Sequence, residues 1–79
     1  MITINEFREL DLDGKITEVK DAVYLSERID DLLLIRLYRL SGFYVESFSE
    51  LPADRVVHFI AFESNDLLLP YIIPQKIRQ

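Results

Sequence analysis

Residues 32–63 read LLLIRLYRLSGFYVESFSELPADRVVHFIAFE, and this stretch decides the fold. It contains three runs of aliphatic and aromatic residues, which are separated by Ser41-Gly42 and by the segment 51–54, Leu-Pro-Ala-Asp. Runs of this length with turn residues between them are typical of the strands of an antiparallel meander. We therefore expect at least three neighbouring antiparallel strands here.

The alternation of side chains predicts which residues share a face of this sheet. A two-residue turn at Ser41-Gly42 sets Arg36 opposite Ser47, and the most natural pairing across the Pro52 loop sets Ser47 beside His58. One face then carries Leu34, Tyr38, Leu40, Phe43, Val45, Val56, Ile60 and Phe62. The other carries Leu33, Ile35, Leu37, Tyr44, Phe48, Val57, Phe59 and Ala61, interrupted by Arg39 and Glu46. Because short helices cover one face more easily than two, we expect an exposed apolar face that serves as an interface.

The segments on either side of the meander predict short helices and one further strand. Thr3 and Glu6 have the spacing of a capping box, which predicts a helix over about residues 4–10. Leu12, Ile16, Val19 and Val23 continue a helical period through residue 21, and residues 22–28 favour a first strand. Residues 64–66 are suited to capping a short helix at 67–69 that Pro70 limits. The prediction is an α+β fold over a single domain, 1–79: N-terminal helices, an antiparallel meander of three or four strands and a short C-terminal helical turn.

Composition excludes several classes of function. The 79 residues carry a net charge of −5 and contain no cysteine. An acidic chain without a basic face is a poor match for nucleic acid, and no stretch approaches the ~20 apolar residues that span a bilayer. We expect a cytoplasmic protein that binds neither nucleic acid nor membrane. Its acidity suits a basic protein partner, although acidity is also a common route to solubility.

Metal and cofactor chemistry find little support. Residues 9–16, ELDLDGKI, resemble the start of an EF-hand calcium loop, but Glu9 stands where the loop needs Asp and Lys20 where it needs a bidentate Glu. His58 is the single histidine, and without cysteine it leaves few ligands for zinc. We predict no metal and no cofactor.

The predicted register offers one candidate ligand site and one candidate interface. Arg36, Ser47 and His58 would form a row that could bind a small carboxylate or phosphate, with Tyr38 as a further residue. Nothing in the sequence supplies the acid and the oxyanion hole that a nucleophilic triad needs, so no catalytic residue is assigned. The candidate interface residues on the second face are Tyr44, Phe48, Val57 and Phe59.

Residues 36–46 read RLYRLSGFYVE, and residues 56–62 read VVHFIAF. With these stretches the chain resembles a group of short, uncharacterised bacterial proteins that have an L-Y-x-L-x-G-F-Y-V-E hairpin. In that group the hairpin precedes a strand of I-V-x-I-x-x-F type and a Leu-rich segment ending near Pro-Tyr, here residues 64–71. The resemblance covers roughly residues 4–72, but residues 45–48 read VESF where the group often has V-E-V-x-Y. It implies the fold and brings no activity with it.

Two classes of function stay open. The sequence favours a small non-enzymatic interaction module that forms a homodimer or docks on a protein partner through an apolar sheet face or through the outer strand edge. An acidic regulatory or neutralising partner of a basic protein is a special case of this class. The alternative is a small ligand-binding or enzymatic protein that uses the Arg36, Ser47 and His58 row.

Overall fold

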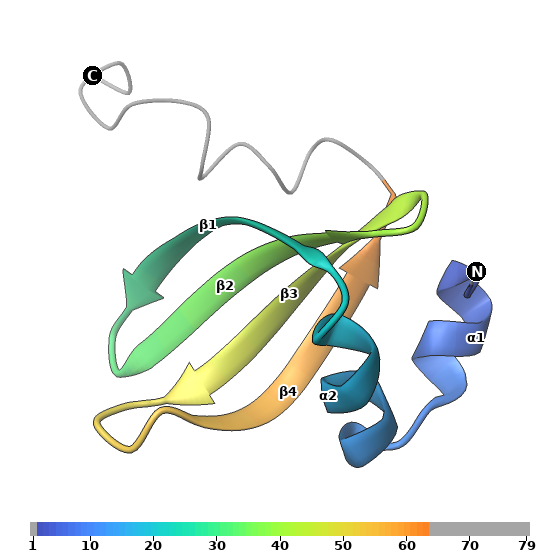
Figure 1. Ribbon diagram of the computed structural model, residues 1–79. Helices are drawn as coiled ribbons and strands as arrows, with labels where there is room; N and C mark the ends of the chain where they lie inside the picture. Colours follow the sequence, from blue (N-terminus) through green and yellow to red (C-terminus); the bar gives the residue numbers. More distant parts are fainter. Residues whose placement is uncertain (1, 64–79) are drawn as a thin grey trace.

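The computed structural model describes residues 2–63, which form two short helices and a four-stranded antiparallel sheet (Figure 1). The elements are α1 (Ile4–Glu9), α2 (Leu12–Val19), β1 (Val23–Asp30), β2 (Leu33–Leu40), β3 (Phe43–Glu50) and β4 (Arg55–Phe62). The strands lie side by side in chain order, so the sheet is a simple meander. The predicted α+β class, the N-terminal helices and the antiparallel meander are confirmed. The helical turn predicted at residues 67–69 lies outside the described residues.

Both helices begin with side-chain caps that the sequence encodes locally. At α1 the Thr3 hydroxyl accepts from the Glu6 amide at 3.1 Å, and the Glu6 carboxylate accepts from the Thr3 amide at 2.8 Å, which is the predicted capping box. At α2 the Asp11 carboxylate accepts from the Gly14 amide at 2.8 Å. The segment that resembles a calcium loop is therefore the cap and body of a helix. This helix ends at Val19 rather than near residue 21, because the chain turns at 20–22 to enter β1.

The β2–β3 hairpin has the predicted register, with Arg36 opposite Ser47, Tyr38 opposite Val45 and Leu40 opposite Phe43. The turn of this hairpin contains one residue with a left-handed backbone. The left-handed backbone angle falls on Ser41, with φ of 59°, and not on Gly42. The glycine that signals the turn is thus not the residue whose conformation favours glycine.

The β3–β4 register agrees with the prediction only near the loop. Glu50 pairs with Arg55 and Ser49 with Val56, but a β-bulge follows, and Phe48 then pairs with His58 and Ser47 with Phe59. Val57 is the extra residue of the bulge, so every later residue of β4 is displaced by one position. The predicted faces of Phe59, Ile60, Ala61 and Phe62 are therefore wrong. Phe59 and Ala61 face the helices, whereas Ile60 and Phe62 share the opposite face with Glu46 and Tyr44.

The core lies between the helices and the half of the sheet that contains β4 (Figure 1). Phe7 of α1 is its centre, because its ring lies 5.9 Å from that of Phe43 and 6.0 Å from that of Phe59. The buried members of the cluster are Phe7, Val19, Leu40, Phe43, Val45 and Phe59. Burial of these aromatic and aliphatic side chains supplies most of the driving force for docking helices as short as these.

The opposite face is not the open apolar surface that the sequence predicts. Ile35, Leu37 and Phe62 lie on it and are all buried. The ring of Tyr44 stacks on Phe62 with centroids 5.6 Å apart. Exposed apolar side chains gather instead on β1 and the turn that follows it. Within residues 2–63 no helix is long and apolar enough to cross a membrane.

Candidate functional site

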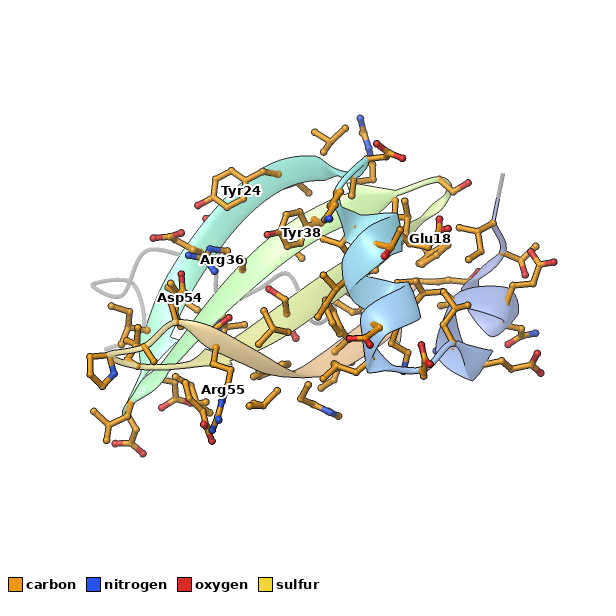
Figure 2. All side chains as sticks on the ribbon, turned by 60° about the horizontal axis from the view of Figure 1, so that its bottom comes forward. Glu18, Tyr24, Arg36, Tyr38, Asp54 and Arg55 are labelled. Atoms are coloured by element: carbon orange, nitrogen blue, oxygen red, sulfur yellow. The ribbon has the colours of Figure 1, made fainter. Side chains whose placement is uncertain are left out.

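Arg36 is the centre of a polar network on the helix-bearing face of the sheet. Its guanidinium donates two hydrogen bonds to the Asp54 carboxylate, from Nη1 to Oδ1 at 3.0 Å and from Nη2 to Oδ2 at 2.9 Å. Its Nε lies 3.7 Å from Oε1 of Glu27, which also accepts a 2.9 Å hydrogen bond from the Tyr24 hydroxyl. Figure 2 shows Arg36 between Tyr24 and Asp54, with Tyr38 beside it toward α2.

This network shifts the acid–base equilibria of its members. The hydrogen bonds from Arg36 hold the pKa of Asp54 below its usual range, and the same bonds raise the pKa of Arg36. Asp54 has a left-handed backbone, with φ of 57°, and the bidentate pair fixes the loop residue against β2. With two carboxylates beside it, Arg36 has its charge offset within the protein.

A cavity of about 200 Å³ lies between α2 and the sheet, beside this network. We call it the α2 cavity. Its apolar side is formed by Ile16, Val19, Val56 and Phe59. Its polar side is formed by Lys20, Arg36, Tyr38 and Ser47. The predicted ligand residues Arg36 and Ser47 therefore line one cavity, together with Tyr38.

His58 does not belong to this site. It pairs with Phe48 on the opposite face of the sheet, where the two rings lie 5.5 Å apart. The predicted row of Arg36, Ser47 and His58 is therefore wrong, because the bulge at Val57 displaces His58 by one residue and turns its side chain to the other face. A ligand site that uses all three residues is excluded.

Four polar residues of the site were not predicted from the sequence: Lys20, Tyr24, Glu27 and Asp54. Asp54 lies 18 residues from Arg36, and only the folded meander brings the β3–β4 loop over β2. In the sequence, Lys20 is notable only because it stands where a calcium loop needs a glutamate. Its position as the C-cap of α2, next to the last buried residue of the helix, was the available signal.

The four predicted interface residues are in different environments. Phe59 is a core residue 7% exposed, so its assignment to an interface is wrong. Tyr44 and Phe48 are half-buried and pair with Phe62 and His58 within the chain. Val57 is 40% exposed in the bulge. Contact of Tyr44, Phe48 and Val57 with a partner stays a prediction.

The largest set of exposed apolar side chains belongs to the other edge of the sheet. We define the β1 surface as Val23, Tyr24, Leu25, Ile29 and Leu32. These residues are between 42% and 72% exposed, and all but Leu32, which follows in the turn to β2, belong to β1. No other segment of residues 2–63 exposes as many large apolar side chains.

Comparison with known proteins gives no assignment: no family model, no curated protein and no solved structure matches the chain. Within the described part of the chain, no group of three or more His, Asp or Glu side chains is placed to hold a metal ion.

Proposed function

We propose that this protein is a non-enzymatic interaction module that associates through the outer edge of β1, with a second copy of the chain as its partner. The observation that carries the proposal is the β1 surface, an edge strand with strongly exposed apolar side chains. Such an edge offers backbone donors and acceptors to another strand, and its apolar side chains gain free energy when that strand covers them.

The two edge strands of the sheet, β1 and β4, differ in their contacts with the helices. The β4 edge lies beside α1 and α2, and the Arg8 guanidinium donates a 2.9 Å hydrogen bond to the carbonyl oxygen of Ala61. The β1 edge lies on the other side of the sheet, and β1 comes near a helix only at its start, where the chain enters it from α2 (Figure 1). The helices therefore pack against the half of the sheet that contains β4, and the proposed partner binds at the opposite edge.

Charged residues in the middle of β1 would ordinarily oppose the approach of another strand. Here they are engaged within the subunit. Glu27 lies beside Arg36, and Arg28 lies 3.4 Å from the buried carboxylate of Glu46. Their charges are offset on β2 and β3, which lowers the repulsion between two β1 strands.

A twofold axis perpendicular to the sheet brings two β1 strands together in antiparallel orientation. A bulge between Tyr24 and Ser26 interrupts the regular ladder, so the regular part of the contact runs over residues 26–30. The dimer is then a continuous sheet of two meanders, with Ile29 inside the regular contact and Leu32 just beyond it.

Sedimentation equilibrium tests the proposal. The chain has a mass of 9.3 kDa, and at ~100 μM we expect twice this mass, because a dimer with a dissociation constant of a few micromolar is mostly assembled at that concentration. Ile29→Lys should weaken the dimer at least ~10-fold by placing a charge in the contact. Because Ile29 is 67% exposed, the unfolding free energy of the Ile29→Lys protein should differ from that of the wild type by less than ~0.5 kcal/mol.

Leu12→Lys is the matched control, because Leu12 is 40% exposed on α2, away from β1. It should leave the dimer unchanged. A monomer at ~100 μM would refute the proposal, and so would equal weakening by both variants.

A further inference from the structure

We infer that the α2 cavity binds a small carboxylic acid whose apolar part is about the size of a benzene ring. This site is independent of the β1 surface, since none of the β1 surface residues lines it. The inference rests on three features: the volume of the cavity, its division into an apolar and a polar side, and the hydrogen-bonding state of its polar groups.

The volume of about 200 Å³ suits a ligand of roughly ten non-hydrogen atoms. An apolar cavity of ~150 Å³ in a protein interior is large enough to hold benzene. Here the apolar side is formed from two directions, by Val19 of α2 and by Phe59 and Val56 of β4. A flat ring or a branched alkyl group would bury its surface between the helix and the strand.

The polar side has hydrogen-bonding capacity that the described residues leave unused. Ser47 is only 3% exposed, and within residues 2–63 neither its hydroxyl nor that of Tyr38 has a hydrogen-bond partner. Each of these two hydroxyls lines the cavity and could donate a hydrogen bond to a carboxylate oxygen.

The charge of the site points to an anion. Arg36 is offset by Asp54 and Glu27, whereas the Lys20 ammonium forms no ion pair with any carboxylate of the described residues. Glu18 and Asp21 flank this part of α2 but do not line the cavity. Lys20 is therefore the cation available to a ligand carboxylate, and the two hydroxyls would fix its orientation.

Three small molecules separate the contributions of charge and apolar surface. Benzoate carries both, acetate carries the charge, and benzyl alcohol carries the ring. In a ¹H–¹⁵N NMR titration, benzoate should bind with a dissociation constant of ~1 mM, as ligand size allows, and shift the amides around Val19, Ser47 and Phe59. Acetate and benzyl alcohol should each bind at least ~10-fold more weakly.

Variants at the cavity identify the groups that hold the carboxylate. Lys20→Gln should weaken the binding of benzoate at least ~5-fold and leave the affinity for benzyl alcohol unchanged, because the substitution removes only the charge. Ser47→Ala should weaken benzoate by a similar factor. Lys15→Gln is the matched control, since Lys15 belongs to the same helix but places its ammonium over the Phe7 ring outside the cavity.

Any of three results would overturn the inference. The first is the absence of saturable benzoate binding at ~10 mM, and the second is equal binding of benzoate and benzyl alcohol. The third is an equal loss of affinity in Lys15→Gln and Lys20→Gln. The amide shifts of each variant without ligand report independently whether its fold is intact.

Discussion

Alanine substitutions at two neighbouring residues of β4 test the β3–β4 register, which places His58 on the face opposite the site. Phe59 is 7% exposed and packs edge-on against Phe7, whereas Ile60 is 37% exposed on the opposite face. Without the bulge at Val57 these environments would be exchanged, and Ile60 would lie under the helices. Phe59→Ala and Ile60→Ala therefore report on which side chain faces the core.

The expected losses of stability differ severalfold. Truncation of a buried phenylalanine costs ~3–5 kcal/mol. Phe59→Ala also removes one of the two ring contacts of Phe7, the one with Phe59, and leaves the one with Phe43. Ile60 already exposes about a third of its surface and lies under no helix, so Ile60→Ala should cost only ~1–2 kcal/mol. A domain of this size is stable by roughly 4–12 kcal/mol, so the loss of Phe59 removes a large part of the total.

Urea unfolding followed by far-ultraviolet circular dichroism measures both losses under the same conditions. In thermal unfolding, Phe59→Ala should lower the melting temperature by about 15 °C or more and Ile60→Ala by less than about 10 °C. An Ile60→Ala loss equal to or greater than that of Phe59→Ala would refute the bulged register and restore His58 to the face of Arg36.

Three further predictions concern local features of the fold. Ser41→Gly should raise the unfolding free energy by ~0.5 kcal/mol, because Ser41 has a left-handed φ. Gly42→Ala should be tolerated, because an added Cβ meets no atom within 4 Å; thermal unfolding measures the effect of both substitutions. Asp54→Asn should destabilise the protein at neutral pH, because the Asp54 carboxylate pairs with Arg36 only when it is ionised. The difference from wild type should begin to shrink below pH ~4, and it should vanish only once the pH has fallen through the lowered pKa of Asp54; urea midpoints between pH 2 and 7 measure this. Thr3→Ala should cost ~1 kcal/mol in urea unfolding by removing the capping box of α1, and an unchanged midpoint would mean that α1 does not depend on its cap.

The features predicted correctly from the sequence are those that depend on neighbouring residues. The cap of α1 needs only Thr3 and Glu6, three residues apart. The β2–β3 register follows from a two-residue turn, because such a turn leaves no freedom in how the strands meet. Arg36 and Ser47 were placed together for the same reason, and this pair survives in the α2 cavity.

The features that the sequence did not reveal depend on contacts between distant segments. The bulge at Val57 leaves no mark on the apolar pattern, since both faces of β4 stay apolar in either register. Likewise, the pairing of Asp54 with Arg36 depends on the path of the β3–β4 loop, which turn chemistry alone does not specify.

By itself, the sequence determined the class of the fold, the order of its elements and the register of the β2–β3 hairpin, because short-range sterics and hydrogen bonds decide these. Only the tertiary structure decided the face of His58, the burial of Phe59 and the assembly of the α2 cavity. It also decided that helices lie beside β4 and leave β1 bare. The physical reason is that the alternation of side chains along a strand defines the two faces of the sheet but does not say which face or which edge the helices pack against. The packing of Phe7 and Val19 against one half of the sheet decides this.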